Sequence, residues 1–204
     1  MRVIGVIGGV ASGKSRVASL LAQLGAGVLD ADRVAHEVLR SREVRQTLSE
    51  RWGPKILGPD GQIDRGEVAA IVFGESAVAA GELAFLEQVT HPIIGRRLAE
   101  ELSQLAASGA HQAVVLDAAV MLKSGWDKLC DHIIFVEAST EVRMARASAR
   151  GWSEKEFTAR EAAQESLDLK RERADVRVDN TGSLADTRAA LEQFWHNHIE
   201  AAPA

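Results

Sequence analysis

Eight residues near the N-terminus, Gly8-Gly9-Val10-Ala11-Ser12-Gly13-Lys14-Ser15, fit the phosphate-binding pattern G-x-x-x-x-G-K-[ST]. In such a loop the backbone N–H groups point at one phosphate group, and the N-terminus of the following helix adds partial positive charge. Lys14 can reach the β- and γ-phosphates of a nucleotide, and the Ser15 hydroxyl can ligate Mg²⁺. A plain glycine-rich turn is the alternative, but an apolar run before the motif and an amphipathic stretch after it favour phosphate binding. The residues predicted to contact the nucleotide here are Gly9, Val10, Ala11, Ser12, Gly13, Lys14 and Ser15.

Two acidic positions follow apolar runs, where the carboxyl ends of strands in open α/β sheets bind ligands. Asp30 and Asp32 are separated by one residue, so their carboxylates point in different directions. One of them could orient a substrate hydroxyl and take its proton; alternatively, both acids only stabilise the first turn of a helix. Asp117 ends the run Ala113–Asp117 and could hold Mg²⁺ through water, as the acid of a Walker-B strand does. That pattern is common, and its weight here comes from the phosphate loop.

Arginines recur in a charged block between residues 141 and 177. Arg143, Arg146 and Arg150 lie at i, i+3 and i+7, which predicts one face of a helix that begins near Ser139-Thr140. Such a run is usually a solvated helix face. In a nucleotide kinase, however, an arginine-bearing lid closes over the phosphates and stabilises the transferring charge. The pattern leaves both interpretations of Arg146 and Arg150 open.

Short apolar runs alternate with longer amphipathic stretches along the chain. The elements that they form must position the candidate site residues. Runs without polar alternation indicate strands that are buried on both faces. Strands alternating with helices predict a parallel sheet that is covered by helices. The expected strands are residues 3–7, 28–30, 113–117, 132–136 and 176–179.

Helices are expected over residues 15–24 and 31–39, on either side of the second strand. Between Ser41 and Ser108 only helical pattern is found, broken by glycine and proline, which predicts a helical insertion. Ser183 and Asp186 resemble a capping box that opens a terminal helix reaching about Ile199.

Composition places the chain in the ordinary globular class. Its 204 residues are enough for one domain or one domain with a small insertion, and a net charge of −5 excludes broad polyanion binding. We therefore expect no nucleic-acid partner. No apolar run approaches the length of a membrane span, and the single cysteine, Cys130, fits a reducing cytoplasm and predicts an inert, buried thiol. We expect a soluble cytoplasmic protein, and the oligomeric state is not predicted.

Taken together, these segments resemble the dephospho-coenzyme A kinase family over nearly the whole chain. The resemblance rests on the loop Gly8–Ser15, the segment Asp30-Ala31-Asp32, His91-Pro92, Leu116-Asp117, Arg146 with Arg150, Arg160 with Gln164, Ala174-Asp175 and Asn180-Thr181-Gly182-Ser183. It implies an α/β fold of the P-loop NTPase type, with three layers and a parallel five-stranded sheet. It also implies ATP- and Mg²⁺-dependent phosphorylation of the ribose 3′-hydroxyl of dephospho-CoA, giving coenzyme A and ADP.

The resemblance further implies three functional regions within a single domain of residues 1–204. Residues 1–40, 109–139 and 175–204 would form the core, 41–108 the helical acceptor-binding region and 140–174 the lid. Asp32 would act as the base near the acceptor hydroxyl, with His91 at the edge of the acceptor site. Lys14 and Arg146 would serve transfer, Ser15 and Asp117 the metal, and Arg16, Arg146, Arg150 and Asn180 the ATP, with Asn180 beside the adenine. His91 has an alternative interpretation as a polar residue at a helix entry before Pro92.

Several residues depart from the usual pattern of that family. Ala11 replaces a glycine, which we expect to be tolerated only if φ stays negative at that position. Arg16 replaces a threonine and adds a charge; Ala119 replaces a proline; Lys123 replaces an acid. Because Gly13, Lys14, Ser15, Asp32 and Asp117 are retained, we expect an active enzyme. The alternatives are another P-loop small-molecule or nucleotide kinase, or a degenerate nucleotide-binding module.

Overall fold

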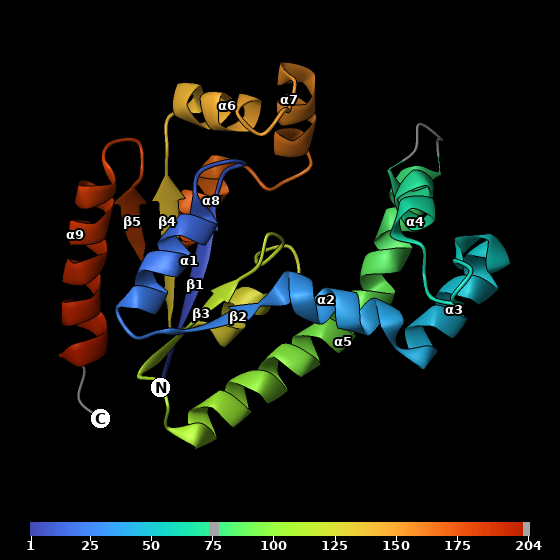
Figure 1. The fold of residues 1–204 in the computed structure, drawn as a ribbon, viewed down its shortest axis with the longest axis horizontal. Coiled ribbons are helices and arrows are strands. Elements are labelled where there is room, and N and C mark those ends of the chain that lie inside the picture. The colour runs from blue at the N-terminus through green and yellow to red at the C-terminus, as the bar shows by residue number, and fades with distance from the viewer. Residues whose placement is uncertain (74–77, 202–204) are drawn as a thin grey trace. The chain divides into compact units, whose positions relative to one another are not determined.

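A five-stranded parallel sheet organises the part of the chain that carries the phosphate loop (Figure 1). The structure is a computed structural model that describes residues 1–73 and 78–201. The strand order is β2-β3-β1-β4-β5, and all paired strands are parallel. The strands are β1 (Arg2–Gly8), β2 (Gly27–Asp30), β3 (Ala113–Asp117), β4 (His132–Glu137) and β5 (Val176–Asp179). The predicted parallel sheet is confirmed, and β3 and β5 have the predicted bounds.

The strand register brings the predicted acids to one edge of the sheet. Asp117 at the end of β3 pairs with Val6 of β1 on one side and with Asp30 of β2 on the other. Two carboxylate-bearing residues therefore end neighbouring strands, next to the point where β1 runs into the phosphate loop. This is the edge at which open α/β sheets bind their ligands.

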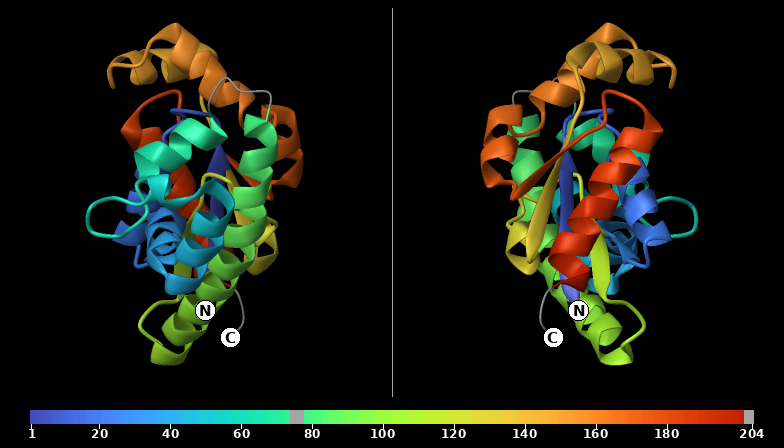
Figure 2. Two further views of the ribbon diagram at one scale, coloured as in Figure 1. Left: turned by 90° about the vertical axis from the view of Figure 1, so that its right-hand side faces the viewer. Right: turned by 90° about the vertical axis from the view of Figure 1, so that its left-hand side faces the viewer.

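Helices cover both faces of this sheet. Figure 2 shows α1 (Lys14–Gln23) and α9 (Leu184–Trp195) on one face and α8 (Leu167–Arg173) on the other. The first face forms a closed apolar core, because β-branched strand residues meet the apolar sides of both helices. Its largest buried members are Ile4, Leu21, Ile134, Leu191, Phe194 and Trp195. The predicted capping box of Ser183 and Asp186 is present, and after α9 a π-helical turn continues over His196–Glu200.

Two short helices, α6 (Thr140–Ser148) and α7 (Glu154–Ala162), lie between β4 and α8 in the chain. Ser139 caps α6 by accepting a hydrogen bond from the Val142 N–H, so the predicted start is confirmed. The expectation that Arg150 shares a face of this helix was wrong. The helix ends at Ser148, and the chain turns at Gly151 with φ +81°, so Arg150 lies in the turn.

Contacts group residues Ala31–Glu100 into a second compact unit, separate from the unit formed by Met1–Asp30 and Glu101–Ala204. It contains α2 (Ala31–Arg40), α3 (Arg42–Trp52), a 3₁₀ turn (Pro54–Ile56), α4 (Arg65–Val72) and most of α5 (Ala79–Ser108). Within the described part of residues 41–108, helices and one isolated antiparallel bridge between Leu57 and Ile63 are present, as the absence of a strand pattern predicted.

The alternative interpretation of His91 as a residue at a helix entry was wrong. His91 and Pro92 both lie inside α5. Figure 1 shows α5 as a bent helix, and a proline inside a helix favours bending because it lacks the N–H that would bond the carbonyl four residues earlier. Among the helices of residues 1–73 and 78–201, none combines the length and the apolar character needed to cross a membrane.

Candidate active site

The phosphate loop connects β1 to α1 through two residues with left-handed backbone. Gly13, the N-cap of α1, has φ +100°, and no side chain caps the helix there. Ala11 has φ +57°, so the expectation that this position keeps φ negative was wrong. A left-handed backbone is strained for a residue that has a Cβ atom. Alanine has the smallest such side chain, and its methyl group packs with Val10 and Phe157 in a small buried cluster. The loop therefore keeps its curled shape although a glycine is missing.

Lys14 lies in the first turn of α1 and folds back over the start of the loop. Its Nζ donates hydrogen bonds to the Gly8 carbonyl oxygen at 3.4 Å and to the Gly9 carbonyl oxygen at 3.3 Å. Ser15 and Arg16, the next two residues of the helix, are exposed. Together these groups form a cationic helix start that can bind a polyphosphate.

A clamp formed by Arg146 and Asn180 holds the loop from the side of β5. Asn180 Nδ2 donates to the Ser12 carbonyl oxygen at 2.7 Å, and Arg146 Nη1 donates to the same oxygen at 3.0 Å. Arg146 Nη2 also donates to the Asn180 carbonyl oxygen at 2.7 Å, while Asn180 Oδ1 accepts from the Thr187 hydroxyl at 3.2 Å. The structure thus brings together two predicted site residues, and both fix the loop backbone directly. Their contact with ATP stays a prediction.

Arg146, beside the loop, lies within electrostatic reach of two other guanidinium groups. The pKa of Arg146 is lowered from its usual value by burial first, and then by the positive charges of Arg16 and Arg150. Like charges repel, so this arrangement carries a cost that a bound anion removes. Arg16 and Arg150, which lies in the turn after α6, therefore both act electrostatically on Arg146, and the binding of ATP by these three arginines stays a prediction.

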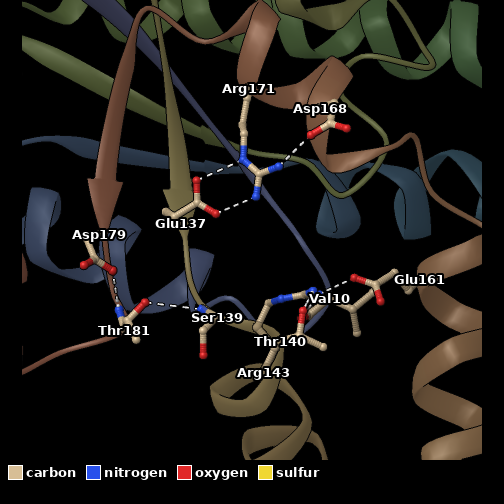
Figure 3. Close-up of polar contacts among 10 residues, drawn as sticks. All are labelled: Val10, Glu137, Ser139, Thr140, Arg143, Glu161, Asp168, Arg171, Asp179 and Thr181. Carbon is tan, nitrogen blue, oxygen red and sulfur yellow. Dashed lines mark hydrogen bonds and ion pairs between the residues drawn. The ribbon is translucent and has the colours of Figure 1, made fainter.

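Arg143, noted in the sequence only as part of the arginine run, supports the other side of the loop (Figure 3). Its guanidinium is 2% exposed, donates to the Val10 carbonyl oxygen and to the Thr140 hydroxyl, and forms an ion pair with Glu161 of α7. The guanidinium carbon also lies 5.4 Å from the centre of the Phe157 ring. This side chain therefore ties the loop, α6 and α7 together.

Arg171 fixes α8 to the sheet in the same view (Figure 3). Its guanidinium forms a two-pronged bond with the carboxylate of Glu137, the last residue of β4, at 3.0 and 2.8 Å. It also bonds Asp168 at 2.7 Å. A bidentate arginine–carboxylate pair is geometrically specific, so it sets the position of α8 against the end of β4.

Lys170 is a buried charged residue of this region that sequence reasoning did not single out. Its side chain is 3% exposed, and its ammonium group donates to the Gln164 side chain at 2.7 Å. In the sequence it stands among many exposed charges, and no pattern separates it from them. The only available signal was its place six residues after Gln164, which the family resemblance had singled out.

The predicted acids and metal ligands are divided between the two compact units. Asp117 lies at the sheet edge beside the loop, and the Ser15 hydroxyl is exposed in the first turn of α1. Asp32 and His91 belong to the second unit, where Asp32 is exposed in the first turn of α2 and His91 is half-buried in α5. Across the described residues, no group of three or more His, Cys, Asp or Glu side chains is placed to hold a metal ion.

Two further sequence predictions concern residues close to β3 and β4. Cys130 is half-buried, where the sequence predicted a buried thiol. Burial together with the negative charges of Asp127, Asp131 and Asp175 raises its pKa to about 12, which disfavours the reactive thiolate. Lys123 lines a cavity of about 530 Å³, whose other charged residues are Asp127, Lys128, Glu165 and Arg173.

Comparisons with known proteins agree in one family. A family model described as dephospho-CoA kinase matches residues 2–186. The dephospho-CoA kinase of Symbiobacterium thermophilum is 40% identical over 197 residues, which cover 96% of this chain and 80% of that protein. The dephospho-CoA kinase of Carboxydothermus hydrogenoformans is 37% identical over 191 residues, covering 93% and 90% respectively.

Solved structures give the same fold. TT1252 from Thermus thermophilus superposes with a TM-score of 0.78 at 36% identity and covers 97% of both chains. Shikimate kinase from Acinetobacter baumannii, at 15% identity and a TM-score of 0.53, covers 100% of this chain and 96% of its own. The predicted α/β fold of P-loop type is confirmed.

Proposed function

Because the chain belongs to the dephospho-CoA kinase family, we propose that it transfers a phosphoryl group from ATP to the ribose 3′-hydroxyl of dephospho-CoA. The products are coenzyme A and ADP. The observation that carries this proposal is the match of residues 2–186, together with a phosphate loop whose Gly13, Lys14 and Ser15 occupy a strand–loop–helix junction. The enzyme is a phosphotransferase with an alcohol acceptor.

Transfer of this kind depends on positioning and charge neutralisation. The loop N–H groups and the start of α1 would bind the phosphates, with Lys14 on the terminal groups and Arg146, Arg150 and Arg16 alongside. The Asn180–Arg146 clamp supports this role, because it fixes the Ser12 carbonyl and with it the loop that holds the phosphates. We place the ATP adenine beside Asn180 by family resemblance.

Asp32 would orient the acceptor hydroxyl and take its proton as the new oxygen–phosphorus bond forms. We infer that residues 41–108 supply the acceptor-binding region, with His91 at its edge, and that residues 140–174 form the lid. These assignments follow the family pattern. Helices α6 to α8 fit a lid in one respect, since Arg143 and Arg146 of this segment reach the loop carbonyls of Val10 and Ser12.

The donor set fits Mg²⁺. Ser15 offers an exposed hydroxyl at the helix start, and Asp117 offers a carboxylate at the neighbouring sheet edge, which are the hard oxygen ligands that Mg²⁺ takes. Kinase sites complete the coordination with waters and substrate phosphates, so a cage made only of protein groups is not required. When bound, the ion would neutralise charge on the phosphate oxygens.

ADP release with and without dephospho-CoA tests the function in a coupled assay. We expect acceptor-dependent release for the natural chain and none for Lys14→Ala. A preference for a nucleoside monophosphate as acceptor would instead indicate another P-loop kinase. ATP binding without acceptor-dependent release would indicate a nucleotide-binding module.

A further inference from the structure

Lys170 of α8 places a buried ammonium group at the end of β1. Its Nζ donates to the Gly8 carbonyl oxygen at 3.5 Å, and Lys14 Nζ lies 3.4 Å from that same oxygen. Two ammonium groups from different elements therefore converge on one carbonyl oxygen, at the residue where the phosphate loop begins. Lysines are almost never fully buried unless a partner offsets the cost.

The position of Lys170 is fixed by the packing of α8 on the loop. A Cβ atom on Gly9 would lie 3.0 Å from a methyl group of Leu167 and 2.8 Å from the Arg143 guanidinium, so the loop leaves no spare room there. The Arg171–Glu137 pair anchors the same helix one residue further along. Lys170 is thus held where it is by its helix and does not depend on its own weak bond to Gly8.

Both lysines line one small cavity at the carboxyl end of the sheet. Its volume is about 10 Å³, about the least that admits a single water molecule. Ala118, Ala119 and Leu122 form apolar walls, and charges interact more strongly in such surroundings than in water. Glu165 also lines the cavity, and one of its carboxylate oxygens is buried without a hydrogen-bond partner in the described part of the chain.

The charges around Lys170 leave its ammonium group incompletely compensated. Burial is the largest influence and, with the charge of Lys14, lowers the pKa of Lys170 to about 8; Glu165 and Glu161 act in the opposite direction, and Arg143 lowers it further. A phosphate oxygen between the two ammonium groups would remove their repulsion and supply the missing negative charge.

We infer that Lys170 is a second phosphate-binding lysine of this site, which contacts the terminal phosphate group of ATP beside Lys14 and stabilises the charge that develops on it during transfer. The role of Lys170 in phosphoryl transfer rests on the proposed kinase function. Its binding of the terminal phosphate does not depend on that function. Lys170 neither gains nor loses a proton in the reaction. The bond between the γ-phosphorus and the β-phosphate oxygen breaks as the bond to the acceptor oxygen forms.

Equilibrium binding of ATP and ADP to the full chain, without acceptor, is the first test. We expect Lys170→Met to weaken ATP binding roughly 10- to 100-fold, because a charged hydrogen bond is lost, and to leave ADP binding within about threefold. Lys170→Arg should keep most of the ATP affinity. Lys128→Met, at an exposed lysine outside the proposed lid, is the matched control and should bind both nucleotides as the natural chain does.

Equal weakening of ATP and ADP binding by Lys170→Met would mean that the substitution only disturbs the loop, and unchanged ATP binding would mean that Lys170 does not contact the nucleotide. Either result would overturn the inference. If the acceptor proves to be something other than dephospho-CoA, the contrast between ATP and ADP is unaffected, so the two proposals fail separately.

A pH profile supplies a readout that a purely structural lysine would not move. With Lys170 protonated in the active form, kcat/KM for ATP should fall tenfold per pH unit above about pH 8. Lys170→Arg should move this alkaline limb to higher pH, because arginine stays protonated. Glu165→Gln should move it to lower pH, because the carboxylate of Glu165 raises the pKa of Lys170. An alkaline limb that is the same in all three proteins would refute the role of Lys170.

Discussion

At the scale of single residues, the phosphate loop accommodates alanine at position 11, where the usual family pattern has glycine and where a positive φ is unfavourable for a residue with a side chain. Ala11 has the only positive φ of any non-glycine residue in 1–73 and 78–201. A left-handed backbone costs alanine roughly 1–2 kcal/mol. Part of this cost is offset because the methyl group is buried against Val10 and Phe157. The sign of φ could not be predicted from the sequence, because it depends on how α6 and α7 enclose the loop.

Substitutions at Ala11 should therefore separate backbone strain from packing. Ala11→Val puts a β-branched side chain on a left-handed backbone and should lower the free energy of unfolding by about 1–3 kcal/mol. Ala11→Gly should stay within about 1 kcal/mol of the natural chain, since relief of strain is offset by the lost methyl burial and the freer unfolded chain. Urea unfolding measures both. Equal stability of the valine and glycine variants would show that the loop does not hold φ positive in solution.

The acid proposed as the base can be tested in the same way. Asp32→Asn keeps the size of the side chain and removes its ability to take a proton, so kcat should fall about 10²–10⁴-fold. Glu192→Gln, an exposed acid of α9, controls for the change in net charge. Full kcat in the Asp32→Asn enzyme, measured by acceptor-dependent ADP release, would remove the assignment of Asp32 as the base.

At the scale of elements, the loop is held by side chains from α6 and from the segment after β5. The sequence singled out Arg146 and Asn180 as nucleotide contacts, but it gave no sign that both bond the Ser12 carbonyl. Pattern and family resemblance identify residues near a site, whereas the bonds among them depend on how separate elements pack. The same reason explains why Lys170 was not singled out from the sequence. Its burial follows from the packing of α8 against β1, and its charge-dense sequence segment carries no pattern that indicates this burial.

The clamp predicts an element-level effect of one substitution. Asn180→Asp keeps the shape but turns the donor facing the Ser12 carbonyl into an acceptor, so the loop should lose about 1–3 kcal/mol of stabilisation. ATP affinity should fall with it, as measured by titration calorimetry. Asn197→Asp makes the same charge change at an exposed position and should leave ATP binding unchanged. Natural affinity in Asn180→Asp would mean that Arg146 alone fixes the loop.

At the scale of the molecule, the strands and their parallel direction followed from short β-branched runs, most closely for Ala113–Asp117 and Val176–Asp179. The strand order could not be predicted, since it depends on which buried faces fit across long sequence separations.

One consequence of the assembled sheet is a cluster of aromatic and imidazole rings at the amino end of β4. His132 at the start of β4 lies edge-on to Phe194 and to His198, with ring centres 5.8 and 5.0 Å away.

This cluster predicts how stability depends on pH. Burial first, and then the charge of His198, lowers the pKa of His132 below its ordinary value of 6.5. Between the folded and unfolded pKa the unfolded chain binds more protons, so the stabilisation present above about pH 6.5 is lost as the pH falls. Urea unfolding at pH 7 and 5.5 should show a smaller loss for His132→Gln than for the natural chain. His36→Gln, at an exposed position, should behave as the natural chain, and an equal loss in His132→Gln would contradict the prediction.

The pairing of β1 also sets when this site can form during protein synthesis. Arg2 pairs with Ala113 and Ile4 with His132, so the strand that leads into the phosphate loop has its native neighbours only after much of the chain has been translated. At roughly 5–20 residues per second, that wait is on the order of 6 to 25 seconds. Throughout it, the apolar side chains of β1 remain uncovered on the nascent chain. Strand β1 therefore stays without its native neighbours until β3 and β4 have been made, and during that time its apolar side chains are open to other contacts.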